Sequence, residues 1–262
     1  MMQILQVLLD MKKIGFILSV FVCLSFLFVQ NCYAVGHIYL VAVGISDYPG
    51  DDHDLRLPAT DAQTMVNLYR TNSMATTVLL TNKQATVTNI VNNIKNVFSK
   101  AAEDDIVVFY FSGHGAPGAF CAYDNNLTYK AIKKAFAYSK CKNKMIFADA
   151  CFSGGLRQSN KKTTNASAAS GLNVLLFLSC KDGETSLELP GMKNGLFTAH
   201  LERCLRGGAD VNRDRIITAK ELFTPVHDNV MKTAAKRNNH QQHPVMWGRF
   251  SDDMPVMIWP KK

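Results

Sequence analysis

One histidine and one cysteine in this sequence each follow an apolar run and stand close to glycine. Residues 106–111 (IVVFYF) lead into His114 and Gly115, and residues 145–148 (MIFA) lead into Cys151. A histidine beside a cysteine promotes the nucleophilic thiolate, and backbone amides such as those of Gly115 and Cys151 can hold an oxyanion. The alternative is a turn histidine and a buried thiol. We favour nucleophilic catalysis because both residues follow buried strands, beyond whose carboxyl ends ligands bind.

The elements that must position these residues alternate between strand and helix along the chain. Apolar runs predict strands at 37–45, 76–80, 106–111, 145–148, 174–178 and 256–259. Helical spacing of apolar residues predicts helices at 59–70, 87–98, 129–138, 195–205 and 218–235, with Pro225 expected to kink or split the last one. The alternation predicts an α/β fold, an open and mostly parallel sheet with helices on both faces. If the strands before His114 and Cys151 are neighbours, the two side chains meet at one rim of that sheet.

The N-terminal segment has the organisation of a secretory signal peptide. Lys12 and Lys13 precede an apolar run at 14–29, and small residues follow up to Ala34. The run is shorter than the roughly 20 residues of a spanning helix, which favours cleavage over an uncleaved anchor. We therefore predict a signal peptide at 1–34, export to the periplasm or the medium, and one domain at 35–262, without a permanent membrane anchor.

Composition excludes several classes of protein. The chain has 262 residues, 47% of them hydrophobic, and 29 Lys and Arg against 21 Asp and Glu. These values exclude disordered, collagen-like and multi-span membrane proteins. The formal charge of +8 becomes +7 without residues 1–34, because Lys12, Lys13 and Asp10 leave. Basic residues are scattered and have no interleaved aromatic residues, so a polyanion-binding module ranks last and no nucleic-acid partner is expected.

Five of the seven cysteines lie beyond residue 34, and an odd number leaves at least one thiol without an intramolecular partner. We assign that thiol to Cys151. The other four, Cys121, Cys141, Cys180 and Cys204, allow two disulfides in three pairings or, equally, four buried thiols.

Two motifs resemble those of a known family. FYFSGHG (109–115) and DACFSGG (149–155) are similar to the His-Gly and Asp-x-Cys motifs of the caspase-like cysteine peptidases, most closely the bacterial metacaspases. Further segments resemble the family at 41–50, 57–62, 179–188, 194–201 and 242–248. The resemblance implies the caspase–hemoglobinase fold, with Cys151 as nucleophile and His114 as general base and acid. Ala150 and Phe152 depart from the usual Asp-Ser-Cys-His of metacaspases and put the subfamily in doubt.

The resemblance also implies cleavage of protein or peptide substrates after Arg or Lys. The matching positions for the substrate side chain are Asp61, Ser112 and Asp149. Buried carboxylates suit this role, because they bind guanidinium and ammonium groups through charge-assisted hydrogen bonds. For Asp61 the alternative is a carboxylate that only stabilises a helix N-terminus.

Members of this family often mature by self-cleavage. The polar loop at 156–170 contains Arg157, Lys161 and Lys162, and we predict that one of them is an autolysis site. The chemistry needs no cofactor. The competing function is a caspase-like domain that binds without catalysis, against which the intact His114 and Cys151 argue.

A second motif points to calcium. Asp210, Asn212, Asp214 and Glu221 stand at positions 1, 3, 5 and 12 of a pattern like the EF-hand loop, whose ligands are oxygens. Position 6 is normally Gly, and Arg215 stands there. The alternative is a connecting turn in which Asp and Asn bind the local backbone. The resemblance adds that metacaspases are often activated by Ca²⁺, so Ca²⁺ is a candidate activator or structural ion.

Overall fold

The computed structural model describes residues 36–150, 174–181, 183–237 and 240–260. The predicted signal peptide at 1–34, the nucleophile Cys151 and the loop at 156–170 therefore lie outside the described residues.

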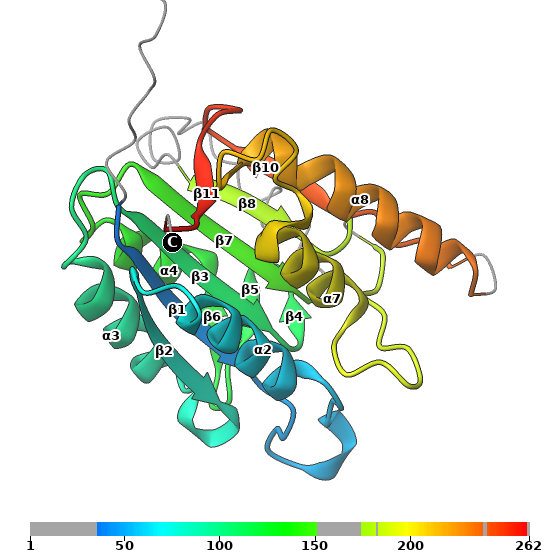
Figure 1. Cartoon of the computed structure of the whole chain (residues 1–262). Coiled ribbons are helices and arrows are strands. Elements are labelled where there is room, and N and C mark those ends of the chain that lie inside the picture. The colour runs from blue at the N-terminus through cyan, green and yellow to red at the C-terminus, as the bar shows by residue number, and fades with distance from the viewer. Residues whose placement is uncertain (1–35, 151–173, 182, 238–239, 261–262) are drawn as a thin grey trace, which may run out of the picture. The chain divides into compact units, whose positions relative to one another are not determined.

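A six-stranded sheet forms the centre, with strand order β10-β8-β7-β3-β1-β2 (Figure 1). Its strands are β1 (Ile38–Gly44), β2 (Ala75–Thr81), β3 (Ile106–Ser112), β7 (Asn143–Asp149), β8 (Val174–Leu178) and β10 (Val245–Gly248). All neighbours pair in parallel except β10, which is antiparallel to β8. All seven residues of β3 are buried, as expected for a parallel strand covered on both faces. The predicted open, mostly parallel sheet is confirmed.

Helices cover both faces of this sheet. The helices α2 (Pro58–Arg70), α7 (Leu196–Arg203) and α8 (Ala219–Ala235) share one apolar core, and α3 (Val87–Phe98) and α4 (Tyr129–Phe136) share the other. Figure 1 shows α2 and α7 in front of the sheet and α4 behind it. Side chains of β1 alternate between the two cores, as the two-residue period of a strand requires.

Smaller elements complete the fold. A three-stranded sheet contains β4 (Gly115–Ala116), β5 (Ala119–Cys121) and β6 (Asn126–Thr128), and a two-stranded one pairs β9 (Ile216–Thr218) with β11 (Pro255–Ile258). Short helical turns lie at η1 (Asp51–His53), η2 (Asn82–Gln84) and η3 (Cys204–Gly208). Because β4 directly follows His114, the small sheet of β4–β6 fixes the chain just beyond the candidate catalytic histidine.

The structure corrects two details of the expected elements. Pro225 does not split the last long helix, because α8 continues through it from Ala219 to Ala235. The strand expected at 256–259 forms as β11 but pairs with β9 and not with the central sheet. None of the helices among the described residues is both long and apolar enough to cross a bilayer.

Cys121, Cys141 and Cys204 are free thiols, and Cys141, Cys180 and Cys204 are buried. The structure therefore excludes two disulfides, and Cys121 departs from the alternative of four buried thiols because it is half-buried. Burial raises the pKa of Cys141 and of Cys204 to about 11, so these thiols are unreactive near neutral pH.

Candidate active site

The strands that precede the histidine and the cysteine, β3 and β7, are direct neighbours, which fulfils the condition that the sequence left open. In the register of β3 and β7, Ser112 is the partner of Asp149. His114 and Cys151 each follow two residues later in the sequence, so the chain enters both positions from the same edge of the sheet. Cys151 itself lies outside the described residues, and its pairing with His114 stays a prediction.

His114 is held through its backbone and its ring. Its amide donates a hydrogen bond of 2.9 Å to Tyr48 Oη, and Tyr48 Oη in turn donates one of 3.1 Å to the Cys121 carbonyl. The ring atom Nε2 lies 2.8 Å from the carbonyl oxygen of His53. Because a carbonyl only accepts, this contact assigns the hydrogen to Nε2 and leaves the lone pair on Nδ1. The neutral ring therefore offers Nδ1 as the base.

The residues flanking His114 are both glycines. Gly113 has φ +152°, and a Cβ there would lie 2.6 Å from Tyr48 Oη, so the close contact of this tyrosine with the backbone requires glycine. Gly115 begins β4, where it is the partner of Phe120. The oxyanion role expected of the Gly115 amide stays a prediction, because Cys151 lies outside the described residues.

Asp61 is buried inside the fold and does not act as a helix cap. Its Oδ1 accepts hydrogen bonds of 2.9 Å from Asn194 Nδ2 and from the Gly195 amide, and its Oδ2 accepts one of 2.9 Å from Ser112 Oγ. All three donors belong to segments far from α2 in the sequence. The structure therefore brings Asp61 and Ser112 together. Asp61 also lies in the first turn of α2, where the helix-terminus alternative puts it, so its role in substrate binding stays a prediction.

Asp149 is the second carboxylate of the same cluster. Its Oδ2 accepts hydrogen bonds from the Thr198 amide at 3.0 Å and from Thr198 Oγ1 at 2.7 Å, and its Oδ1 accepts one from Ser186 Oγ. Gly195 lies close to both carboxylates. A Cβ at this position would lie 2.6 Å from Asp149 Oδ2 and 3.1 Å from Asp61 Oδ2. We call Asp61 and Asp149 the acidic pair.

Burial and mutual repulsion make the acidic pair hold a proton. Asp61 is 1% exposed and Asp149 6% exposed. Desolvation, followed by the charge of Asp149, raises the pKa of Asp61 to about 8, and desolvation raises the pKa of Asp149 as well. Among the described residues neither carboxylate forms an ion pair with Lys or Arg. A cation placed between them would therefore displace a proton and gain two charge-assisted partners.

Sequence reasoning missed the polar residues that hold these groups: Tyr48, His53, Ser186, Asn194 and Thr198. Ser186, Asn194 and Thr198 fall in segments that resemble the family, but nothing in their residue types indicated which carboxylate they bind. His53 acts through its backbone, which no side-chain pattern can reveal.

The candidate calcium loop forms a turn whose side chains hydrogen-bond to one another and to the backbone of the loop. Arg215 has φ 70°, the left-handed conformation that position 6 requires, so the arginine does not prevent the turn. Asp210 accepts from the Arg215 amide and Asn212 binds Asp214, while Glu221 caps α8 by accepting from Thr218. In the described segments, no three His, Cys, Asp or Glu side chains are grouped to hold a metal ion. Calcium binding stays a prediction.

A comparison with protein-family models shows the family, and two solved structures share the fold. The family model named "Caspase domain" matches residues 39–254. A protein of Geobacter sulfurreducens, GSU0716, has a similar solved structure, with a TM-score of 0.61 at 17% identity over 86% of this chain and 100% of that one. Caspase-1 of Spodoptera frugiperda gives a TM-score of 0.62 at 15% identity over 88% and 94%. A comparison with curated protein sequences gives no match.

Proposed function

This chain belongs to the caspase-domain family of cysteine peptidases, and on that premise we propose that it is an endopeptidase that cleaves proteins after Arg or Lys. The observation that carries the specificity is the acidic pair, two buried carboxylates with three hydrogen-bond donors each and no cation paired to them among the described residues. A substrate guanidinium or ammonium group supplies that cation. True caspases, which cleave after Asp, need arginines in this place.

In the proposed reaction, His114 Nδ1 takes the proton of the Cys151 thiol, and the thiolate sulfur attacks the carbonyl carbon of the peptide bond. The oxyanion is held by the amides of Gly115 and Cys151. The amine then leaves with the proton from His114, and a thioester to Cys151 remains. His114 next activates a water molecule, which hydrolyses the thioester and regenerates the thiol. The hydrogen bond from Nε2 to the His53 carbonyl favours the tautomer that this sequence needs.

Three further properties belong to the same proposal. The segment at 1–34 directs export and is removed, and one of Arg157, Lys161 and Lys162 is cut by the enzyme itself. Ca²⁺ acts as an activator or structural ion at the loop of Asp210 and is not required for the chemistry.

The decisive experiment is hydrolysis of matched fluorogenic peptides that end in Arg, Lys or Asp, with freshly reduced protein in Ca²⁺ and in EDTA. We expect cleavage after Arg and Lys, none after Asp, and none by Cys151→Ala or His114→Ala. Cleavage after Asp alone contradicts the specificity. No cleavage of any peptide supports a binding domain without catalysis. A Cys151→Ala chain that is still nicked within 156–170 contradicts self-processing.

A further inference from the structure

A buried glutamine, Gln242, hydrogen-bonds to the serine that binds Asp149 of the acidic pair. Gln242 is 1% exposed and uses both ends of its amide group. Its Nε2 donates hydrogen bonds of 3.1 Å to the Ser179 carbonyl and to Ser186 Oγ, and its Oε1 accepts one of 3.1 Å from the Leu187 amide. Gln242 therefore links the end of β8 to the segment whose hydroxyl binds Asp149.

The direction of the bond between Gln242 and Ser186 decides where the Ser186 proton points. A hydroxyl has one proton to donate and lone pairs that accept. Because Gln242 Nε2 donates to Ser186 Oγ, a lone pair of that oxygen is occupied, and its proton is directed to Asp149 Oδ1. If Gln242 were lost, the Ser186 hydroxyl would be free to rotate away from the carboxylate.

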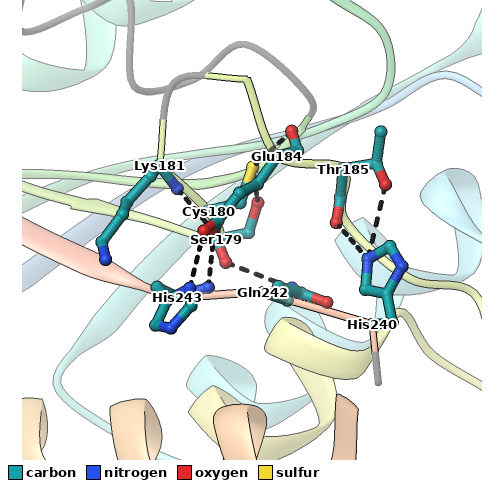
Figure 2. A network of polar contacts seen from close by, with 8 residues as sticks. All are labelled: Ser179, Cys180, Lys181, Glu184, Thr185, His240, Gln242 and His243. Atoms are coloured by element: carbon teal, nitrogen blue, oxygen red, sulfur yellow. Dashed lines mark hydrogen bonds and ion pairs between the residues drawn. The ribbon is translucent and has the colours of Figure 1, made fainter. Parts of the chain in front are cut away.

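The backbone around Gln242 is anchored from the other side. His243 donates its amide to Glu184 Oε2 at 2.7 Å, and its ring atom Nδ1 lies 2.6 Å from Glu184 Oε1. Figure 2 shows this pair, with Gln242 and Ser179 beside it and His240 at the Thr185 end. His243 and His240, one and two positions from Gln242, thus limit its movement, and a side chain held in this way can orient its neighbour.

The negative charge around Asp149 makes the hydrogen bond from the Ser186 hydroxyl important for this carboxylate. Asp61 faces it across Gly195, Glu188 adds a further negative charge nearby, and the neutral Tyr110 hydroxyl contacts Thr198 at 2.6 Å. Burial and the charge of Glu188 both disfavour the ionised form of Asp149, and the donors on its two oxygens favour it. Removing the Ser186 donor therefore makes ionisation of Asp149 less favourable, and Asp149 is the carboxylate that we propose binds the substrate cation.

We propose that Gln242 is a positioning residue for the cation-binding carboxylate: it directs the Ser186 hydroxyl to Asp149 Oδ1, so that Asp149 is aimed at the basic side chain of the substrate. This inference rests on the proposed function for the identity of the cation. It predicts an effect on KM and little effect on kcat, because the hydrogen bonds of the Gln242 side chain run to Ser179, Ser186 and Leu187 and not to His114.

The kinetic test measures kcat, KM and thermal stability for Gln242→Ala and Gln242→Glu with the Arg peptide. We expect KM to rise about tenfold and kcat to change less than about threefold, the size expected when a buried ionised group loses one oriented donor. Gln242→Glu keeps the side-chain volume and covers the case in which the alanine variant does not fold. The matched control is Gln241→Ala, the exposed neighbouring glutamine, whose KM should stay unchanged.

Because Gln242 is proposed to act on Asp149 by orienting Ser186, a double-mutant cycle distinguishes this effect from a general loss of stability. In a Ser186→Ala background, Gln242→Ala should raise KM no further. If the two substitutions raise KM additively, or if only the melting temperature falls, Gln242 has a structural role and the proposal is overturned.

A second measurement does not depend on hydrolysis. Carbon-13 NMR of labelled aspartate carboxyls, with Asp149 assigned from Asp149→Asn, gives its pKa in folded Cys151→Ala protein. Gln242→Ala should raise that pKa relative to the parent, and Gln241→Ala should not. An unchanged pKa overturns the positioning role whatever the peptide assays show. A raised pKa in a protein that cleaves no basic peptide supports the positioning role and contradicts the proposed function alone.

Discussion

The hydroxyl of Tyr48 accepts a hydrogen bond of 2.9 Å from the backbone amide of His114 and donates one of 3.1 Å to the Cys121 carbonyl. The rings of Tyr48 and His114 also lie against each other, with centroids 4.9 Å apart. His114 is therefore held by a side chain from the loop after β1, while its ring contacts the His53 carbonyl of the same loop.

Removal of this hydroxyl should slow the chemistry. We expect Tyr48→Phe to lower kcat about tenfold with KM nearly unchanged, because small displacements of a general base reduce rate without weakening substrate binding. Steady-state kinetics on the Arg peptide measure this. The control is Tyr138→Phe, at an exposed tyrosine, and it should leave kcat and KM unchanged. An unchanged kcat in Tyr48→Phe contradicts a positioning role for the hydroxyl.

The acidic pair should destabilise the substrate-free protein at high pH. The pKa of Asp61 is raised to about 8 in the folded state, so the folded state binds a proton that the unfolded state has lost. Stability therefore falls as pH rises from the ordinary aspartate pKa, near 4, toward 8. Asp61→Asn keeps the acceptor for Asn194 and Gly195 and removes the charge.

We expect Asp61→Asn to melt at a higher temperature than the parent at pH 8, by about 2–4 °C for each kcal/mol recovered, with a smaller difference at pH 5. Cleavage after Arg should fall by at least about tenfold because one carboxylate is gone. Calorimetry at both pH values provides the measurement. A variant that is less stable than the parent at pH 8 would show that Asp61 is ionised without cost in the folded protein.

Gly195 should tolerate no side chain. A methyl group there would lie 2.6 Å from Asp149 Oδ2 and 3.1 Å from Asp61 Oδ2, so one or both carboxylates must move. We expect Gly195→Ala to raise KM for basic peptides more than tenfold, about the effect of losing a direct charge-assisted contact. Circular dichroism establishes that the variant is folded. A folded Gly195→Ala enzyme with the parent's KM is incompatible with substrate binding at the acidic pair.

The loop of Asp210 provides a test for calcium. Asp210 Oδ1 is buried and has no hydrogen-bond partner in the described structure, and a bound cation would satisfy it. We expect millimolar Ca²⁺ to raise the melting temperature, since a ligand that binds only the folded state stabilises it. Asp210→Asn should reduce the rise, and Asp253→Asn, at an exposed acid, should not. Equal melting temperatures in Ca²⁺ and EDTA would leave the loop as a connecting turn.

Much of the fold followed from local patterns. Residues 106–111 are apolar at every position, which indicated a strand buried on both faces, and β3 is that strand. The helix predicted at 87–98 is α3 with the same bounds, because its apolar residues keep one helical face. By contrast, β10 was missed, because its four residues are half-buried or exposed and its pairing with β8 is not encoded in its own pattern.

The sequence by itself determined the strands and helices and which residues we predict to carry the chemistry: a histidine and a cysteine after buried strands, and carboxylates in the matching motifs. Only the tertiary structure decided how they are held. Asp61 accepts from Asn194 and Gly195, which lie 133 and 134 positions further along the chain. Hydrogen-bond partners depend on which segments meet in the folded chain, and residue type alone cannot specify that meeting. For the same reason the sequence did not indicate Gln242. Its residue type is that of an ordinary polar residue, but in the fold it is buried and hydrogen-bonds to the serine that binds Asp149.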